Sequence, residues 1–159
     1  MQTERLTIKP LLGSDVAEVV AMDDHAEVRA GVDPFGDLLP AEEAGLRAHE
    51  EVLVARGGFN AIRRRDTGAF VGVLQFEECA GGERELGYRL RPDRWGRGYA
   101  AEAATAMVNA GLEEGAPRVF AHALEANAGS IAVMRRAGLQ YVGPWSYKGL
   151  AGVEYAVTR

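Results

Sequence analysis

The chain has one cysteine, no long apolar run and no repeated or low-complexity segment, and each absence narrows what it can be. The single cysteine, Cys79, excludes an internal disulfide and fits a reducing compartment. No apolar stretch approaches the ~20 residues that a transmembrane helix needs. Residues 1–6 contain no apolar signal-peptide core. We therefore expect a cytoplasmic protein with no membrane partner.

Basic residues are also fewer than acidic residues. The 159 residues include 18 Lys and Arg against 23 Asp and Glu, a formal net charge of −5. This balance argues against nonspecific nucleic-acid binding and is compatible with a cationic substrate such as an amine. We expect no nucleic-acid partner and no metal site. Cys79 follows Glu77 and Glu78, so a reactive thiolate is disfavoured and a spectator at a strand end is favoured.

The hydrophobic pattern predicts a single α+β domain over residues 1–159, with a mixed sheet. Asp66-Thr67-Gly68 is a hairpin turn between two of the strands, which with the next strand form an antiparallel meander. The expected strands cover residues 5–10, 59–64, 70–76, 85–90, 119–124, 140–147 and 153–157.

Four helices are expected between these strands. Ser14-Asp15 signals the start of the first, and the acids Glu42 and Glu43 stand early in the second, over 41–56. The third, over 98–114, has a full amphipathic pattern with small residues at its N-terminal end. The fourth, over 130–137, ends at Gly138. A loop is predicted over 31–40.

The segment Trp95-Gly96-Arg97-Gly98-Tyr99-Ala100 lies between a strand and the third helix. The first N–H groups of a helix lack intrahelical partners and, with the helix dipole, form an anion site. Arg97 adds positive charge, and the glycines keep the backbone uncrowded. Taken alone, the segment is weak evidence for a ligand site and is readily explained as a tight strand-to-helix turn. It does not fit a Walker A loop or a dinucleotide fingerprint.

Residues 85–92 followed by 95–103 closely resemble the core motif of the GNAT acetyltransferase superfamily. Asn127-Ala128-Gly129-Ser130 and the later 135–139 resemble the second motif of its RimJ/RimL-like branch. The resemblance covers nearly the whole chain in order. It implies a mixed, mostly antiparallel sheet of about seven strands flanked by about four helices, with the fourth and fifth strands splayed apart and acetyl-CoA in the gap.

The resemblance also implies a set of residues that bind acetyl-CoA. The backbone of residues 89–91 would pair with the pantetheine arm, and the N–H groups of 96–100 would hold the pyrophosphate. Asn127 would bond the pantetheine and Arg136 would approach the nucleotide phosphates. The full set is Arg89, Leu90, Arg91, Trp95, Gly96, Arg97, Gly98, Tyr99, Ala100, Asn127, Ser130 and Arg136.

The implied reaction moves acetyl directly from the thioester to an amine. The Leu90 N–H is the candidate donor to the oxyanion. Many superfamily members have a tyrosine that protonates the CoA thiolate, but Met134 stands there in this chain. Ser130, one turn earlier, is expected to stabilise the sulfur by a hydrogen bond, although a serine there is also a natural helix N-cap.

The base that deprotonates the amine has several candidates. Glu85 is the first, acting directly or through a chain of water, with a solvated strand-end carboxylate as the alternative reading. Glu77 is the second. His122 titrates near neutrality, but a lone histidine on an apolar strand is more often packed or exposed.

The acceptor is expected to be an amine, either a protein N-terminus or a small molecule. Neutralising a lysine-like amine at pH 7 costs roughly 4.6 kcal/mol, whereas an α-amine costs about 1.4 kcal/mol. Without an assured strong base, the α-amine is favoured. Asp33, Phe35 and Asp37 are expected to border the acceptor site, with solvated loop residues as the alternative reading. The stretch 145–147 lines either that cleft or the interface of a homodimer. A noncatalytic acetyl-CoA-binding module is the alternative from another class.

Overall fold

The computed structural model describes residues 1–32, 54 and 57–159. The helix expected over 41–56, apart from Val54, and the expected acceptor residues Asp33, Phe35 and Asp37 lie outside the described residues.

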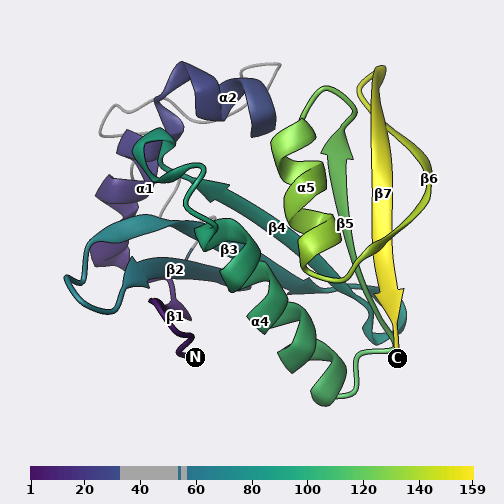
Figure 1. Ribbon diagram of the computed structural model, residues 1–159, viewed down its shortest axis with the longest axis horizontal. Coiled ribbons are helices and arrows are strands. Elements are labelled where there is room, and N and C mark those ends of the chain that lie inside the picture. The colour runs from purple at the N-terminus through teal and green to yellow at the C-terminus, as the bar shows by residue number, and fades with distance from the viewer. Residues whose placement is uncertain (33–53, 55–56) are drawn as a thin grey trace.

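The described chain forms one seven-stranded mixed sheet with the strand order β1-β2-β3-β4-β5-β7-β6 (Figure 1). Neighbouring strands are antiparallel except β4 and β5, which are parallel. The predicted α+β class, the sheet and the meander of β2, β3 and β4 are confirmed. The strands are β1 (Leu6–Pro10), β2 (Phe59–Arg64), β3 (Phe70–Glu78), β4 (Arg84–Leu90), β5 (Arg118–Leu124), β6 (Gln140–Tyr147) and β7 (Leu150–Thr158).

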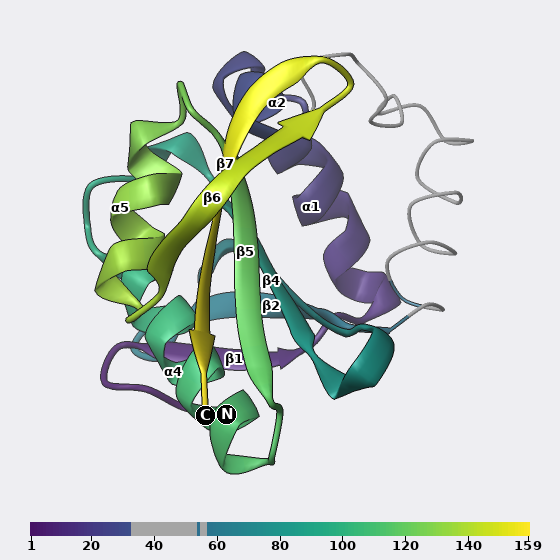
Figure 2. The same ribbon diagram turned by 90° about the vertical axis from the view of Figure 1, so that its right-hand side faces the viewer.

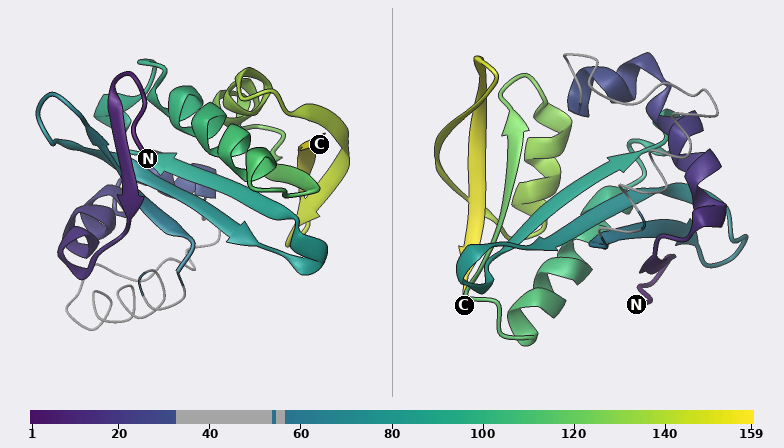
Figure 3. Two further views of the ribbon diagram at one scale, coloured as in Figure 1. Left: turned by 90° about the horizontal axis from the view of Figure 1, so that it is seen from below. Right: turned by 180° about the vertical axis from the view of Figure 1, so that it is seen from behind.

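Helices cover both faces of the sheet. In the left view of Figure 3, α4 (Tyr99–Glu113) crosses one face of the sheet and α1 (Val16–Asp23) lies against the other. The short helix α2 (Ala26–Val32) follows α1 and was not predicted, because seven residues carry too little periodicity to be recognised. Among the described helices, none is both long and apolar enough to cross a membrane.

The helix α5 spans Ala128–Arg136 and therefore starts earlier than the predicted 130–137. Its N-cap is Asn127, whose Oδ1 accepts a hydrogen bond from the Ser130 N–H at 3.0 Å. Ser130 is thus the third helical residue rather than the cap. The alternative reading of Ser130 as an N-cap is wrong, and its hydroxyl is not used to start the helix.

Each face of the sheet has its own core. Residues such as Leu74, Val108 and Met134 pack together beneath α4 and α5, and Met134 is completely buried. Val19, Met22 and Val73 form a second, smaller core beneath α1 and α2. The strand alternation decides which face a side chain joins.

The strands β4 and β5 pair only at their start, through Arg84 with Val119 and Glu85 with Phe120. Beyond these pairs the two strands diverge, as the ribbon in Figure 1 shows. The predicted splay of the fourth and fifth strands is therefore present. It leaves the second half of β4 with an unpaired edge in the middle of the sheet.

Candidate active site

A cleft of about 1260 Å³ opens at this splay. It is larger than the roughly 300–1,000 Å³ of a typical small-molecule pocket, so it has room for a long ligand together with an acceptor. Most of the residues expected to bind acetyl-CoA line it, as does Glu85. These cleft-lining residues are Glu85, Arg89, Leu90, Trp95, Gly96, Gly98, Tyr99, Ala100, Asn127, Ser130 and Arg136.

The hydrogen-bond ladder decides which backbone groups of β4 face the cleft. The Arg91 N–H donates to the Val71 carbonyl at 3.0 Å, so this pair is hydrogen-bonded across β3 and β4. Because antiparallel pairs alternate, the Gly72–Leu90 pair is not hydrogen-bonded, and the Leu90 N–H points away from β3. The same alternation holds for Tyr88. The open backbone groups on β4 therefore belong to Tyr88 and Leu90, while those of Arg89 and Arg91 face β3.

The segment that follows β4 turns sharply into α4. Gly96 and Gly98 have φ values of 70° and 78°, left-handed conformations that a glycine adopts without strain. The first backbone bond of the helix runs from the Glu102 N–H to the Gly98 carbonyl, at 3.0 Å. The preceding N–H groups, at the end of the helix that lines the cleft, lack intrahelical partners. The geometry required for anion binding is present here.

Trp95 holds this turn against the strand. Its indole Nε1–H donates to the Leu90 carbonyl at 2.8 Å, while about half of the residue's surface stays exposed. The bond uses the one outward carbonyl at the end of β4. The Leu90 N–H is then the outward group that remains for a ligand at this residue.

The arginines are arranged differently from the expectation. Arg97 and Arg91 are not among the cleft-lining residues, and Arg91 is paired with Asp93 at 2.9 Å. Arg94, which the sequence reading did not select, does line the cleft, and its buried Nε makes no hydrogen bond but lies 3.3 Å from an Asp93 carboxylate oxygen. Its position in the turn at 92–94 was the available signal, since this turn connects β4 to the glycine segment. Arg136 lines the cleft as expected.

The Arg89 side chain points to the α1 face and is held there by a buried ion pair. Its Nε and Nη2 atoms bond the two carboxylate oxygens of Asp23 at 2.6 and 2.9 Å. The side chains of Asp23 and Arg89 are 3% and 14% exposed. This bidentate pair fastens the end of α1 to β4.

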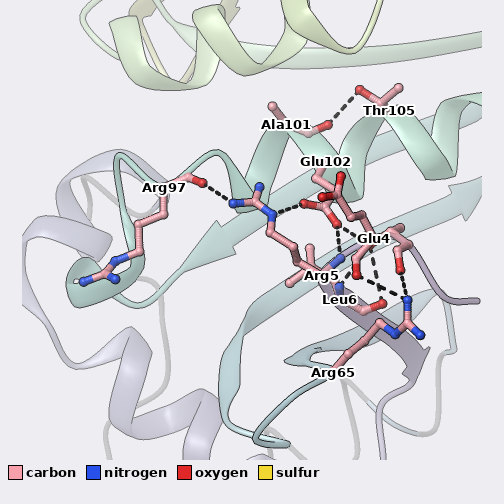
Figure 4. A network of polar contacts seen from close by, with 9 residues as sticks. Glu4, Arg5, Leu6, Arg65, Arg97, Ala101, Glu102 and Thr105 are labelled. Carbon is pink, nitrogen blue, oxygen red and sulfur yellow. Dashed lines mark hydrogen bonds and ion pairs between the residues drawn. The ribbon is translucent and has the colours of Figure 1, made fainter.

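A polar network ties the N-terminal strand region to the glycine segment and α4 (Figure 4). The Glu102 carboxylate accepts bonds from the Thr3 hydroxyl at 2.5 Å and from the Arg5 N–H and Nε at 2.8 and 2.7 Å. Arg5 Nη1 in turn donates to the Arg97 carbonyl at 2.9 Å, while the Arg97 side chain points away from Arg5 in the figure. Burial alone would raise the pKa of Glu102, but the bonds from Thr3 and Arg5 outweigh it and lower the pKa.

Ser130 meets a partner that the sequence reading missed. The Tyr88 hydroxyl donates to the Ser130 carbonyl at 2.9 Å and lies 3.0 Å from the Ser130 Oγ. Burial raises the pKa of Tyr88 to about 12, against the lowering by Ser130, so the phenol stays protonated. Both residues line the cleft. The signal was the alternation along β4, which places residue 88 on the α5 side.

On the opposite side of the cleft, Glu85 lies beside His122. The His122 Nδ1 is 3.3 Å from Glu85 Oε1, and both residues line the cleft. Glu77, the second candidate base, is the cross-strand partner of Glu85 but is not a cleft-lining residue. Trp145 and Tyr147 also line the cleft, with their rings stacked. The stretch 145–147 therefore contributes to the cleft.

Cys79 lies outside the cleft, just after β3. Burial raises the pKa of its thiol, and the nearby carboxylates of Glu85, Glu77 and Glu83 add to the increase. A thiol in this setting is a poor nucleophile. Among the described residues, no group of three metal-ligating side chains comes together.

The chain matches the family model described as an acetyltransferase (GNAT) domain over residues 5–140. The chain therefore belongs to the GNAT acetyltransferase family. It is 24% identical over 151 residues to the uncharacterized N-acetyltransferase YoaA of Bacillus subtilis, and the match covers 90% of this chain and 84% of that protein.

Solved structures have the same fold. A GNAT-family acetyltransferase from Bacillus anthracis has a TM-score of 0.88 and 23% identity, covering 99% of this chain and 97% of its own. RimL, a ribosomal L7/L12 α-N-protein acetyltransferase solved with coenzyme A, has a TM-score of 0.77 and 20% identity, and the match covers 98% of this chain and 95% of that one. The aminoglycoside acetyltransferase AAC(6')-Ib with paromomycin and acetyl-CoA has a TM-score of 0.79 and 14% identity, and the match covers 98% of this chain and 94% of that one.

Proposed function

We propose that this protein transfers the acetyl group of acetyl-CoA directly to an amine, and that the amine is the α-amine of a protein N-terminus. One observation carries the proposal. The splay of β4 and β5 brings the outward N–H of Leu90, the N-terminus of α4 and the Ser130 hydroxyl to a single cleft. These are a strand edge, an anion site and a hydrogen-bond donor, which are what a thioester on a pyrophosphate-linked arm requires.

The donor side of the cleft is built from β4, α4 and α5. The free N–H groups at the start of α4 suit the pyrophosphate, with Arg94 and Arg136 as the nearby cations. The outward backbone groups of Tyr88 and Leu90 suit the pantetheine arm as an added strand. Asn127 Oδ1 is used by the helix cap, so its Nδ2 is the atom left to bond the arm.

The chemistry needs a donor to the oxyanion and a donor to the leaving sulfur. The Leu90 N–H serves the carbonyl oxygen, where charge develops as the amine attacks. The Ser130 hydroxyl serves the thiolate, and Tyr88 holds Ser130 in place. A serine hydroxyl is too weak an acid for efficient protonation, so it stabilises the sulfur mainly by a hydrogen bond.

The acceptor assignment rests on the energetics of deprotonation. Glu85 is the candidate base in the cleft, which Glu27 of α2 also lines. An α-amine needs about 3 kcal/mol less than a lysine side chain to become neutral at pH 7. Both RimL, which acts on a protein α-amine, and AAC(6')-Ib, solved with an aminoglycoside, share this fold at similar TM-scores. We assign the chain to the RimJ/RimL-like branch on Trp95 and the Asn127–Ser130 motif.

The test is a screen of amine acceptors with mass detection of the acetylated product. Peptides with a free N-terminus and no lysine are compared with N-terminally blocked lysine peptides, polyamines and aminoglycosides. Acetyl-CoA binding is measured in parallel by calorimetry. We expect product from the free N-termini. Transfer confined to lysine side chains or small molecules would overturn the acceptor assignment, and binding without any turnover would overturn the enzymatic one.

A further inference from the structure

His122 lies between two carboxylates that come from different strands. Its Nδ1 is 3.3 Å from Glu85 Oε1 on β4, and its Nε2 is 3.0 Å from Glu154 Oε2 on β7. Glu154 is the direct cross-strand partner of His122, and Glu85 belongs to the last pair before β4 and β5 separate. The side chains of Glu85, His122 and Glu154 are 38%, 16% and 24% exposed, so the three form a continuous path from the cleft.

The surroundings fix the orientation of the imidazole ring. Trp145 on β6 stacks on the ring, with centroids 4.5 Å apart and an angle of 15° between the planes, and Phe120 packs edge-on at 5.4 Å. A neutral imidazole donates from one nitrogen, whereas the protonated ring donates to both carboxylates. Within the part of the chain that the structure describes, the charged groups that contact His122 are Glu85 from β4 and Glu154 from β7, and Arg118 from β5 lies beyond Glu154.

Arg118 binds the far side of this group. It pairs with Glu154 and lies 3.2 Å from Glu83. Burial opposes ionisation of Glu154, but the bonds from His122 and Arg118 outweigh burial and lower the pKa of Glu154. Glu154 therefore stays ionised at neutral pH and can hold a positive imidazole beside it.

The proposed reaction releases one proton in each turnover. An ammonium and a thioester become an amide, a thiol and one free proton. One of the two protons lost by nitrogen goes to the sulfur as the C–S bond breaks. The other leaves before the attack and must reach solvent, because the products hold no place for it. A base in the cleft therefore has to pass this proton on in every turnover.

We infer that Glu85, His122 and Glu154 form a proton relay, in which Glu85 takes the proton from the acceptor ammonium and His122 carries it towards Glu154 and solvent. The inference rests on the proposed function and adds to it a positioning and relay role for His122 and Glu154. In water an imidazole is about two pH units more basic than a glutamate carboxylate. A carboxylate coupled to an imidazole thus takes a proton from an amine less unfavourably than a carboxylate alone.

The test uses His122→Gln, which keeps a polar side chain of similar reach but does not titrate. The exposed His25, between α1 and α2, provides the matched control His25→Gln. Acetyl transfer to a peptide α-amine is measured from about pH 6.5 to 9.5, a range that brackets the α-amine pKa of roughly 8. Acetyl-CoA binding and melting temperature are measured on every variant.

We expect His122→Gln to lower kcat at least about tenfold at neutral pH. This is less than the roughly 100- to 10,000-fold contribution of a general base itself, because Glu85 remains in the variant. The ratio of wild-type kcat to variant kcat should fall towards one above the pKa of the amine, because a neutral acceptor no longer needs the relay. His25→Gln should match the wild type throughout. Imidazole added to His122→Ala should restore part of the neutral-pH rate.

Two results would overturn the relay: wild-type kcat in His122→Gln, or a deficit that is constant across the pH range, which a structural role would produce. If His122→Gln does not fold, Glu154→Gln replaces it, since this change leaves the ring and its stacking on Trp145 in place, and the same pH-dependent deficit is expected. Failure of the proposed function looks different, because the wild type itself then lacks turnover with α-amines.

Discussion

The hydroxyls of Tyr88 and Ser130 lie together in the cleft, whereas the place of the family's tyrosine holds no acid in this chain. Met134, in the place of the tyrosine, is completely buried in the core beneath α5 and contributes packing alone. Tyr88 comes from β4 instead and reaches the Ser130 hydroxyl at 3.0 Å. With a pKa raised to about 12, Tyr88 keeps its proton and acts as a hydrogen-bond donor. The proposed thiolate site is thus assembled from two elements.

Replacing Ser130 with Ala should lower kcat by about 10- to 100-fold, the range of a hydrogen bond to a charged group. Acetyl-CoA affinity should stay near that of the wild type, since the backbone groups of β4 and α4 remain. Tyr88→Phe should cost about fivefold, because it only releases the Ser130 hydroxyl from its partner. Steady-state kinetics and calorimetry check both.

The double variant Ser130→Ala/Tyr88→Phe gives the control for this coupling. If Tyr88 acts through Ser130, the double variant is no slower than Ser130→Ala. Wild-type turnover in Ser130→Ala, with intact acetyl-CoA binding, would exclude the role of its hydroxyl.

The helix α4 and the turn before it depend on residues that lie nearly a hundred positions away. Glu102 gathers bonds from Thr3 and Arg5, and Arg5 continues to the Arg97 carbonyl inside the turn (Figure 4). Arg5 also covers the Tyr99 ring, 4.8 Å from its centroid. The start of the chain therefore supports the backbone proposed to bind the pyrophosphate.

Glu102→Gln should raise the KM for acetyl-CoA about three- to tenfold while kcat changes little. The change weakens the ion pair with Arg5, whose contribution is reduced by the exposure of Arg5, so an effect of about 1 kcal/mol is expected. Glu113→Gln, an exposed acid in the last turn of the same helix, is the control. Equal KM values for the two variants would show that the network does not position the turn.

The close approach of β3 and β4 behind Leu90 depends on Gly72. A Cβ at this position would lie 2.3 Å from the Arg89 carbonyl oxygen and 2.7 Å from the Leu90 Cα, so β4 would have to shift. Gly72→Ala should lower the free energy of unfolding by about 1–3 kcal/mol and reduce turnover, since Leu90 moves with its strand. Gly143→Ala, with open space around its Cβ, is the control. Urea unfolding and kinetics measure the two effects, and equal stability of the variants would contradict the prediction.

Across the molecule, carboxylates that accept several bonds link stability to pH. The pKa values of Glu102 and Glu154 are both held below the ordinary 4.5. A carboxylate whose pKa is lower in the folded state stabilises the protein above its unfolded pKa, and this contribution is lost as the pH falls through the folded value. The two groups lie in different parts of the fold, one at α4 and the other on β7.

The urea midpoint should therefore be nearly level from about pH 7 to pH 5 and fall below about pH 4.5. Glu102→Gln should be less stable than the wild type at neutral pH, and its midpoint should fall less steeply in acid. A variant curve parallel to that of the wild type would show that Glu102 does not contribute to the acid loss.

Figure 2 shows the molecule from the edge of the sheet, where β5, β7 and β6 form one part of the sheet and the remaining strands form the other. Local patterns were enough to predict most of the elements in this arrangement. The alternation in β1 to β5, the turn at Asp66–Gly68 and the periodicity of α4 are properties of neighbouring residues. The glycine segment before α4 was recognised for the same reason, although its left-handed conformation is seen only in the structure. The seven residues of α2 carried no comparable signal.

The site was less predictable, because its side chains meet across the sheet. Glu85 and Ser130 were chosen from motifs, but Tyr88 beside Ser130 and His122 between Glu85 and Glu154 depend on strand order and on which face each residue occupies. Arg97 and not Arg94 was chosen from the sequence as the cation of the cleft for the same reason, because the local sequence does not determine where a side chain points. Local interactions thus decided the elements and the glycine turn, while the splay of β4 and β5 decided which residues share a cleft, because it depends on pairings far apart in the chain.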